Sequence, residues 1–318
     1  MDIKIVVRQP GGIDQMVAEP CPADDPGPGE IRLRHHAIGV NFVDVYFRRG
    51  LYALSPSAEL GVEGAGLVEA IGDGVTHLKV GDHVAYAGYP IGAYSSTRLL
   101  PAGRAFLLPK DVSFSAAAAS MLKGLTAHML LTTTYPVGPE TRLLVHAAAG
   151  GLGGILTRWA KHLGATVIGS VSSPEKAELA LGHGADQVIV GRDADIVGEI
   201  RRLTGGTGVD FVVDGIGGAT LLKSLECVGP SGLVASIGQA GGAIPEIPEA
   251  LSSRLVRPSV LAFSRDAKNY AAGAVAVLQA LQAGVIKVSS RNYSLSEAAK
   301  AHADLEAGRS SGSLLLIP

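Results

Sequence analysis

The second half of the chain alternates between short apolar segments and segments with helical periodicity. After Arg142, apolar runs typical of buried strands occur at 143–146, 166–171, 187–190, 209–213, 232–237 and 259–263, and helical segments fall at 152–163, 174–181, 195–203 and 219–227. Strands that are apolar throughout and are separated by helices indicate βαβ crossovers, which build a parallel sheet with helices on both faces. The pattern therefore predicts an α/β domain with a doubly wound parallel sheet of the Rossmann type, in which six strands form a complete sheet.

Residues 1 to about 110 carry shorter strand segments that are broken by glycine and proline. These segments are expected at 3–7, 30–37, 66–71, 83–86 and 105–108. Short strands at this spacing, with turn residues between them, predict an irregular, mostly antiparallel barrel. An alanine-rich helix follows, and Ser113 or Ser115 is its expected N-cap.

The end of the chain is expected to form a long helix at 267–282, then an amphipathic helix, and a last strand at 313–317. We expect this tail to return to the first domain. A length of 318 residues suits about two domains. We predict a barrel-like domain of residues 1–122 and 285–318, and a Rossmann domain of residues 123–284.

Composition argues against several classes of protein. Apolar residues make up 47% of the chain and charged residues 18%, which is too apolar for a disordered chain. The net charge of −2 gives no sign of a nucleic-acid partner or of an anionic membrane surface. The two cysteines, Cys21 and Cys227, lie far apart in the sequence, which argues against a disulfide framework or a four-cysteine zinc lobe and fits a reducing compartment.

The sequence also shows no targeting signal. The first eight residues carry charges within their apolar run, so we expect no signal peptide. No segment reaches the roughly 18 apolar residues of a membrane span. We therefore expect a cytoplasmic protein that does not enter a membrane.

A glycine-rich turn follows the first strand of the α/β domain. The strand leads into residues 147–153 (AAAGGLG) and then into a helix, so the dinucleotide fingerprint G-x-G-x-x-G is matched as Ala148-x-Gly150-x-x-Gly153. Gly150 would let the backbone approach a pyrophosphate, Gly153 would let the helix pack on the strand, and the helix N-terminus would supply free N–H groups. This strand–turn–helix setting favours a dinucleotide site over glycines that serve only a tight turn.

The end of the next strand indicates which dinucleotide binds. Sites that prefer NAD place Asp or Glu about 20 residues after the fingerprint, where it binds the ribose hydroxyls. Here Val171 stands at that point and is followed by Ser172, Ser173 and Lys176. Hydroxyls and a lysine attract the 2′-phosphate of NADP, whereas an acid would repel it, so we expect NADPH as the cofactor. The alternative is that Ser172 or Ser173 caps a helix and Lys176 is a surface lysine, although a cap is compatible with phosphate binding.

Five segments together resemble one family over essentially the whole chain. The segment 41–52 (NFVDVYFRRGLY) is similar to the N-x-x-D-x(5)-G-x-Y segment of quinone oxidoreductases in the medium-chain dehydrogenase/reductase superfamily. The other matches are 61–66 (GVEGAG), 123–126 (KGLT), 146–151 (HAAAGG) and 312–318 (GSLLLIP). The resemblance is to the zinc-free, zeta-crystallin-like quinone reductases of bacteria.

This resemblance implies a chaperonin-10-like barrel as the catalytic domain, a Rossmann domain, NADPH in a cleft between them, and a homodimer joined through the edges of the Rossmann sheets. It implies that Asn41 and Tyr52 face the nicotinamide and the substrate. The other contacts that it implies are Lys123, Thr126 and His128 along the cofactor, Gly150, Gly151 and Leu152 at the pyrophosphate, Ser172, Lys176 and Arg192 at the adenosine phosphate, and Gly215, Ile237, Gly238 and Arg257 at the nicotinamide half.

Two positions depart from the family pattern. Relatives carry Tyr immediately before the arginine at the adenosine phosphate, where this chain has Gly191 before Arg192, so one phosphate contact is missing. His128 stands where relatives often carry Tyr.

The residues at the positions of a catalytic zinc do not suit a metal. Zinc-dependent members of the superfamily use a thiolate and an imidazole in segments that correspond to 39–44 and 61–63. Asn41 and Val62 stand there, and they offer zinc neither ligand. His35 and His36 are neighbours on a strand and point to opposite faces, so they cannot chelate one ion together. We predict an enzyme without a metal.

The absence of a Lewis acid favours an acceptor that takes hydride directly, because nothing would stabilise the alkoxide of a plain alcohol. A quinone or related conjugated carbonyl delocalises the charge itself, so the protein has to orient it and donate hydrogen bonds to the developing oxyanion. Asn41 and Tyr52 are the expected donors, and Tyr52 or water would deliver the proton. The alternative for Tyr52 is a packing aromatic at a barrel edge. We interpret Asp44 and Glu63 as orienting or structural carboxylates.

The leading hypothesis is therefore an NADPH:quinone reductase. A 2-enoyl thioester or alkenal double-bond reductase would share the same scaffold and hydride donor. A non-enzymatic NADPH-binding structural or RNA-binding protein is the alternative of another class, and the near-neutral charge argues against RNA. Aromatic residues make up only 5% of the chain, so we expect no aromatic stacking box in the substrate pocket.

Overall fold

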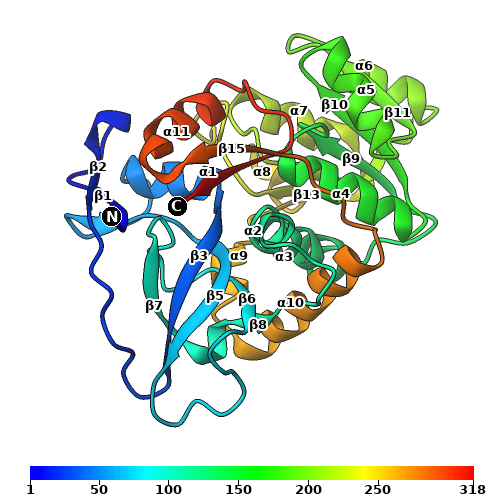
Figure 1. Cartoon of the computed structure of the whole chain (residues 1–318). Helices are drawn as coiled ribbons and strands as arrows, with labels where there is room; N and C mark the ends of the chain where they lie inside the picture. The colour runs from blue at the N-terminus through cyan, green and yellow to red at the C-terminus, as the bar shows by residue number, and fades with distance from the viewer. The chain divides into compact units, whose positions relative to one another are not determined.

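The computed structural model describes residues 1–318, which divide into two compact units. Unit 1 comprises residues 1–123 and 264–318, and unit 2 comprises residues 124–263 (Figure 1). None of the helices combines the length and the hydropathy that crossing a membrane requires.

A seven-stranded sheet forms the centre of unit 1. Its strand order is β15-β16-β3-β5-β6-β8, and β7 pairs with β3 outside this path. The strands are β3 (Glu30–Val40), β5 (Glu63–Ile71), β6 (His83–Ala87), β7 (Thr97–Pro101), β8 (Phe106–Leu107), β15 (Ser290–Ser294) and β16 (Ser313–Ile317). Every pair except β15–β16 is antiparallel, which confirms the prediction of a mostly antiparallel first domain. A smaller antiparallel sheet contains β2 (Met16–Pro20), β1 (Ile3–Val7) and β4 (Ala58–Glu59).

Three short helices occur between the first strands of the chain and the start of unit 2. Helix α1 (Phe42–Arg48) begins directly after β3 and is not predicted by the sequence pattern. Helix α2 (Phe114–Ala118) begins at Ser113, whose Oγ accepts a hydrogen bond from the N–H of Ala116 at 3.1 Å. Of the two expected caps, Ser113 is therefore the one used. Helix α3 (Met121–His128) crosses the boundary between the units.

The C-terminal tail returns to unit 1, as expected. Strand β16 pairs antiparallel with β3, and α11 (Ala298–Glu306) precedes it. Helix α10 (Ala267–Gln282) also belongs to unit 1, whereas the predicted boundary at residue 284 assigns it to the Rossmann domain. The Tyr270 side chain explains this placement, because its hydroxyl donates to the carbonyl of Arg104 at 2.8 Å and accepts from the N–H of Ala87 at 3.0 Å.

Unit 2 is built on a six-stranded sheet of order β11-β10-β9-β12-β13-β14, in which every pair is parallel. The strands are β9 (Arg142–His146), β10 (Thr166–Val171), β11 (Gln187–Val190), β12 (Val209–Asp214), β13 (Val228–Ser236) and β14 (Leu255–Val256). The helices are α4 (Gly151–His162), α5 (Pro174–Gly182), α6 (Ile196–Leu203), α7 (Ala219–Cys227), α8 (Glu249–Ser252) and α9 (Val260–Phe263), with a π-helix at Met129–Thr134. The prediction of a doubly wound Rossmann sheet is confirmed.

The sixth strand lies elsewhere than predicted. Residues 259–263 were expected as a strand, but α9 occupies most of them and the sixth strand is β14. Ser259 explains the difference, since its Oγ accepts from the N–H of Ala262 at 3.3 Å and its carbonyl from the N–H of Phe263 at 2.9 Å. A serine that caps a turn in this way starts a helix in a segment whose apolar residues otherwise suit a strand.

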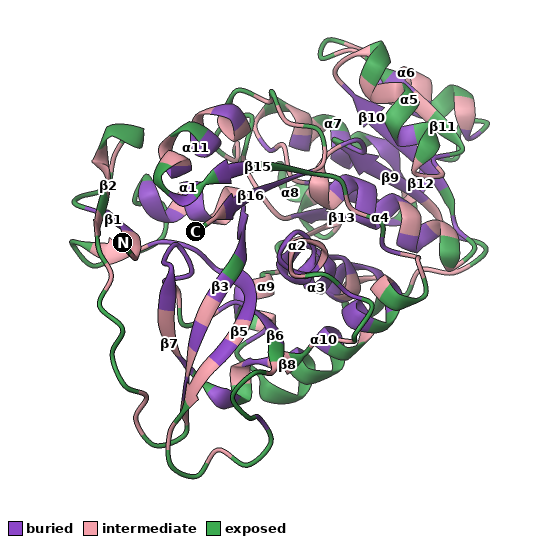
Figure 2. Cartoon of the chain, in the orientation of Figure 1, coloured by how far each residue is buried: buried purple, intermediate pink, exposed green.

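The strands of unit 2 are buried because helices cover the sheet. Figure 2 shows the residues of β9, β10 and β12 mostly as buried, and their burial patterns agree. The apolar core includes Leu144 and Val212 of the sheet together with Ile200 of α6 and Leu221 of α7, all with no exposed surface. This packing fixes the positions of the strands, and with them the polar groups at their carboxyl ends.

Candidate active site

The turn after β9 in unit 2 has the geometry of a phosphate-binding loop. Ala147 adopts a positive φ of 52°, and Gly150 is the N-cap of α4, with its N–H donating to the carbonyl of Ala147 at 2.8 Å. A Cβ on Gly153 would lie 2.2 Å from the Ala147 carbonyl oxygen, so only glycine fits there. This confirms that Gly153 allows the helix to pack on the strand, as the fingerprint predicts.

The same turn fits a dinucleotide. The first N–H groups of a helix lack partners within the helix, so Gly151 and Leu152 at the start of the 12-residue helix α4 can donate to phosphate oxygens. A Cβ on Gly150 would meet only the Ala147 carbonyl oxygen, at 3.2 Å, which leaves the space beside the loop open to a close ligand. The residues present therefore suit the pyrophosphate that the sequence predicts.

The end of β10 carries no acid. Val171 is buried at the position where an NAD-binding site has Asp or Glu. Ser173 is the N-cap of α5, since its Oγ accepts from the N–H of Lys176 at 3.5 Å, so the expected capping serine is Ser173. Ser172 and Lys176 are half-buried beside it, and Arg192 is exposed.

A series of buried polar side chains, joined by hydrogen bonds, supports the strand ends next to the loop. Nδ1 of His146 lies 2.7 Å from Oγ of Ser170, and its Nε2 lies 2.9 Å from Oγ of Ser224. Ser224 donates to Oδ2 of Asp214 at 2.8 Å, and Oδ1 of Asp214 accepts from the N–H of Gly217 at 2.9 Å. Burial lowers the pKa of His146. This series ties the ends of β9, β10 and β12 together; sequence reasoning missed it, although the polar residues that end these apolar strands are its visible sign.

The remaining predicted cofactor residues of unit 2 fall into two groups. Gly215, Ile237, Gly238 and Arg257 directly follow the carboxyl ends of β12, β13 and β14, where open α/β sheets bind ligands. Thr126 and His128 lie on α3, the first buried and the second half-buried. The ring of His128 is 5.9 Å from that of Trp159, and burial lowers the pKa of this histidine.

In unit 1, a buried carboxylate joins Asn41 to Lys123. Oε1 of Glu63 accepts from Nδ2 of Asn41 at 2.8 Å and from Nζ of Lys123 at 3.0 Å, and Oε2 accepts from the N–H of Leu122 at 2.7 Å. Glu63 has no exposed surface, and Asn41 and Lys123 are 6% and 9% exposed. The amide of Asn41 has two N–H groups and uses one here, so the other can donate to a ligand. The structural role predicted for Glu63 agrees with these contacts.

Asp44 fixes the backbone of Asn41. Its Oδ2 accepts from the N–H of Asn41 at 2.8 Å, and the Asp44 N–H donates to the carbonyl of Asn41 at 3.1 Å. These bonds close the first turn of α1 and hold the amide side chain at the end of β3. The orienting role predicted for Asp44 agrees with this geometry.

Aromatic side chains cluster around α1, which the low aromatic content of the chain does not indicate. The ring of Tyr52 lies edge-on to those of Phe47 at 5.4 Å and Tyr46 at 5.8 Å. Phe47 also meets Tyr89 at 6.5 Å, and the guanidinium of Arg265 lies 4.6 Å from the Tyr89 ring centroid. Partial burial raises the pKa of Tyr52, which remains 40% exposed, so its hydroxyl is a proton donor at neutral pH. Composition counts rings without locating them, so it did not indicate this cluster.

The donor set does not fit zinc. Asn41 binds the Glu63 carboxylate, Val62 is buried and apolar, and no group of three or more His, Cys, Asp or Glu side chains is arranged to hold a metal ion. His35 is buried with Ser95 and Tyr86 as hydrogen-bond partners, whereas His36 is exposed and stacks on Phe114. The two imidazoles therefore point to opposite faces of the strand, as predicted.

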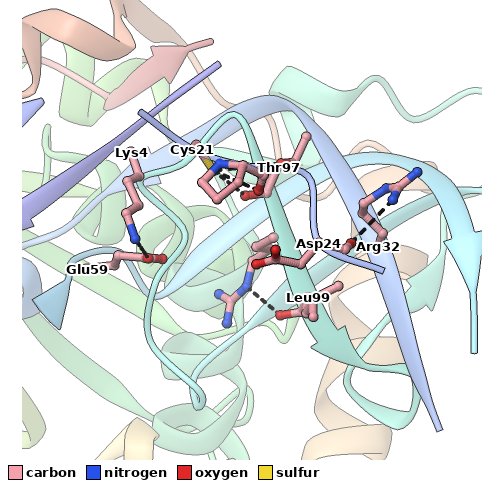
Figure 3. Close-up of a pocket in the computed structure, with 9 residues that line it drawn as sticks. Lys4, Cys21, Asp24, Arg32, Glu59, Thr97 and Leu99 are labelled. Atoms are coloured by element: carbon pink, nitrogen blue, oxygen red, sulfur yellow. Dashed lines mark hydrogen bonds and ion pairs between the residues drawn. The ribbon is translucent and has the colours of Figure 1, made fainter. Parts of the chain in front are cut away.

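Unit 1 also contains a cavity of about 220 Å³ away from these residues, shown in Figure 3. Two of its polar contacts are internal to the lining: Nζ of Lys4 lies 2.8 Å from Oε1 of Glu59, and Sγ of Cys21 lies 3.2 Å from the carbonyl oxygen of Thr97. None of the predicted site residues lines it. The cavity is therefore separate from the candidate site.

Comparison with known families agrees with this architecture. Residues 27–110 match the family described as alcohol dehydrogenase GroES-like domain, and residues 151–269 match the family described as zinc-binding dehydrogenase. A GroES-like sheet followed by a parallel Rossmann sheet defines a medium-chain dehydrogenase/reductase. The zinc in the second description does not apply to this chain, because its residues do not offer the donors.

Comparison with individual relatives identifies the family of the chain more closely. The chain is 40% identical to quinone oxidoreductase 1 of Escherichia coli over 100% of both proteins, and 41% identical to a 2-haloacrylate reductase of a Burkholderia species over 100% of this chain and 99% of that protein. The crystal structure of E. coli quinone oxidoreductase complexed with NADPH matches with a TM-score of 0.95 and 39% identity, covering 99% of this chain and 100% of that one. The chain belongs to the zinc-free quinone oxidoreductase family of the medium-chain dehydrogenases/reductases.

Proposed function

We propose that this protein is an NADPH-dependent quinone oxidoreductase that acts on quinones or related conjugated carbonyl compounds. The observation that carries the proposal is the Asn41 amide, which is tethered to the Glu63 carboxylate where zinc-dependent members of the superfamily bind their metal. A site with this donor set reduces acceptors that stabilise the added charge themselves. The names of the relatives support the same reaction.

Unit 2 supplies the residues that would hold NADPH. Gly151 and Leu152 would present N–H groups to the pyrophosphate, Gly150 would let the backbone approach it closely, and Ser172 and Lys176 would face the 2′-phosphate. Thr126 and His128 contribute from α3, while Arg192 and the residues after β12, β13 and β14 complete the contacts. When bound, the cofactor would supply a hydride, and these residues would position its nicotinamide.

Unit 1 supplies the groups that act on the acceptor. The free N–H of the Asn41 amide and the hydroxyl of Tyr52 donate hydrogen bonds to the acceptor oxygen, which becomes negative as hydride arrives. Reduction of a quinone needs one proton besides the hydride, and the Tyr52 hydroxyl, exposed to water, can deliver it and be reprotonated. The rings of Tyr52 and Tyr89, which pack edge-on against the buried ring of Phe47, offer apolar faces on which a flat acceptor can stack.

A second candidate is reduction of a carbon–carbon double bond conjugated to a carbonyl group. The 41% identity to a protein named 2-haloacrylate reductase favours it. The same donors would then stabilise an enolate, and Tyr52 would protonate the neighbouring carbon.

We also propose that the protein is a cytoplasmic homodimer. Both edge strands of the Rossmann sheet, β11 and β14, carry backbone groups that another strand can pair with. Both cysteines, Cys21 and Cys227, are free, which suits a reducing compartment. Light scattering after gel filtration would give the mass, and a monomer at micromolar concentration would contradict the dimer.

The test of the reaction is a stopped-flow screen of NADPH oxidation against quinones, enals and enoyl thioesters, with a metal assay on the same sample. Quinones should be reduced fastest, and the purified protein should need no zinc. A clear preference for enals or thioesters would favour the second candidate. Binding of NADPH without turnover of any acceptor would contradict both candidate reactions and favour the non-enzymatic alternative.

A further inference from the structure

A buried chain of polar side chains in unit 1 leads from the C-terminal helix α11 to Asp44. Glu306 accepts hydrogen bonds on both carboxylate oxygens from Nη2 of Arg48, at 2.9 and 3.0 Å. Nη1 of Arg48 lies 3.3 Å from Nδ1 of His302, and Nε2 of His302 lies 3.0 Å from the hydroxyl of Tyr94. The Tyr94 hydroxyl donates to Oδ2 of Asp44 at 3.0 Å. We call these five residues the Asp44 network.

Four of the five members of the network are deeply buried. Asp44, Tyr94 and His302 have no exposed surface, and Arg48 is 1% exposed. Removing such groups from water costs free energy that hydrogen bonds must offset, so this many buried polar groups require a complete and specific arrangement. Three separate segments of the chain, far apart in sequence, provide them.

Every hydrogen bond in the network has a fixed direction. Arginine can only donate, so Nδ1 of His302 accepts and the proton of the neutral imidazole is on Nε2. Burial and the nearby Arg48 lower the pKa of His302 to about 3, so the ring is neutral at pH 7. Nε2 then donates to Tyr94, which leaves the Tyr94 hydrogen for Asp44. The network therefore fixes the Tyr94 hydroxyl as a hydrogen-bond donor to Oδ2 of Asp44.

That oxygen is the one that holds Asn41. Oδ2 of Asp44 accepts both from Tyr94 and from the N–H of Asn41, while Oδ1 is buried and has no hydrogen-bond partner. The carboxylate is therefore oriented by Tyr94 on one side and by the Asn41 backbone on the other. Any rotation of Asp44 would release the backbone from which the Asn41 amide extends.

We propose that Asp44, Tyr94 and His302 are positioning residues, which set the place of the Asn41 amide against the acceptor through the Asp44 carboxylate. The inference rests on the proposed function, because it assigns Asn41 contact with the acceptor. Arg48 and Glu306 fix the far end of the network to α11. None of the five residues needs to touch the acceptor.

The network also makes the position of Asn41 depend on pH. The pKa of Asp44 is raised to about 7, mainly by burial and in part by the Glu63 carboxylate, whereas the Asn41 N–H, Tyr94 and Lys123 lower it. Because Oδ2 already accepts two hydrogen bonds, a proton would add to Oδ1. The neutral acid is a weaker acceptor than the carboxylate, so acidification loosens the hold on Asn41.

The test is a double-mutant cycle on kcat with a saturating quinone and NADPH. Asn41→Ala should lower kcat roughly 100-fold, the loss typical of one oxyanion donor, and Tyr94→Phe roughly 10-fold. In the Asn41→Ala background, Tyr94→Phe should cost less than about 2-fold, because it acts through the missing amide. Tyr293→Phe is the matched control, since Tyr293 is also buried and donates to a carboxylate of unit 1, that of Asp304 at 2.7 Å. This control should leave kcat unchanged.

Asp44→Asn is the second variant and tests the pH dependence. For the wild type, kcat should fall as the pH decreases through about 7, and this decline should be absent in Asp44→Asn, whose amide does not titrate. Equal effects of Tyr94→Phe in both backgrounds, or an unchanged pH profile in Asp44→Asn, would overturn the inference. A wild type that oxidises no NADPH with any acceptor would instead overturn the proposed function, so the two failures are distinguishable.

Discussion

Nδ2 of Asn41 lies 2.8 Å from Oε1 of Glu63, and the same oxygen lies 3.0 Å from Nζ of Lys123. The carboxylate therefore does two things: it holds an amide that can act on the acceptor, and it neutralises a nearly buried lysine. Without the carboxylate, the lysine charge would stand in a poorly solvated place with no counter-ion.

Glu63→Gln should destabilise the protein strongly. Loss of one partner of a buried ion pair leaves the other uncompensated, and we expect a loss of about 3 kcal/mol in the free energy of unfolding. Adding Lys123→Met should recover part of that loss, because the unpaired charge is removed. Urea unfolding of the wild type and the two variants measures both effects; a double variant no more stable than Glu63→Gln would show that the ion pair is not the cause.

Lys176→Ala should weaken NADPH binding selectively. A charged contact to the 2′-phosphate contributes roughly 1.5–3 kcal/mol, so the Kd for NADPH should rise by about 10- to 100-fold and that for NADH by less than about 2-fold. Quenching of Trp159, the only tryptophan, reports both titrations. Lys223→Ala, which removes an exposed lysine of α7, is the control and should change neither Kd. Equal losses for the two cofactors would remove the reason for choosing NADPH.

Tyr52→Phe should lower turnover without weakening the binding of NADPH. The variant keeps the ring contacts with Tyr46 and Phe47 but loses the donor to the acceptor oxygen, so kcat should fall roughly 10- to 100-fold. The Kd for NADPH should stay within about 2-fold. Tyr135→Phe, a half-buried tyrosine of unit 2 that stacks on Phe211, controls for loss of a hydroxyl as such. Unchanged turnover would reduce Tyr52 to a packing aromatic.

Two glycine-to-alanine substitutions within helices should have opposite effects. In Gly153→Ala the new Cβ would lie 2.2 Å from the Ala147 carbonyl oxygen, so the loop must move, and we expect a loss of at least about 2 kcal/mol in stability and weaker NADPH binding. In Gly182→Ala the Cβ meets nothing within 4 Å, and a gain of up to about 1 kcal/mol is expected. Thermal unfolding with and without NADPH compares them. Equal tolerance at both positions would contradict the close packing of α4 on β9.

The sequence predicted the parts of the fold that local patterns determine. The order of β9, the glycine turn and α4 follows from an apolar run, Gly150 and Gly153 placed in succession, and the structure has these elements within one residue of the predicted bounds. Helix α1 was missed because its sequence is mostly β-branched and aromatic, and only the bond between Asn41 and Asp44 shows why it forms. The sixth strand was misplaced because Ser259 starts a helix there.

The candidate site was predictable only where a motif is continuous. Asn41 and Tyr52 fall in one segment, and Lys176 follows one strand, so their spacing could be read directly. Contacts across long stretches of chain could not be read in this way: Arg48 and Glu306 are 258 residues apart, and the ring of Tyr89 meets that of Phe47 from a distant segment. No periodicity in the sequence encodes such a pairing.

The free energy of unfolding should increase with pH between roughly 4 and 6. The direction of this change follows from the protonation of three buried groups. Burial lowers the pKa of His35 and of His302 to about 3, so in this range the unfolded chain binds two protons on them that the folded protein does not. Burial raises the pKa of Asp44 to about 7 from its ordinary value of 3.8, so the folded protein holds one proton there that the unfolded chain has released. The unfolded chain thus binds one proton more, and the free energy of unfolding should increase by about 1.4 kcal/mol per pH unit from these groups.

Variants separate these contributions. Asp44→Asn removes the proton of the folded state, so the slope should rise to about two protons, or about 2.8 kcal/mol per pH unit. His302→Gln removes one proton of the unfolded state, so the slope from the remaining pair should fall close to zero. Urea unfolding at several pH values between roughly 4 and 6 measures each slope, and differences between variants cancel the groups they share. A slope that does not change in Asp44→Asn would mean that Asp44 is ionised throughout this range in the folded protein, and the pH dependence argued for Asn41 would fail with it.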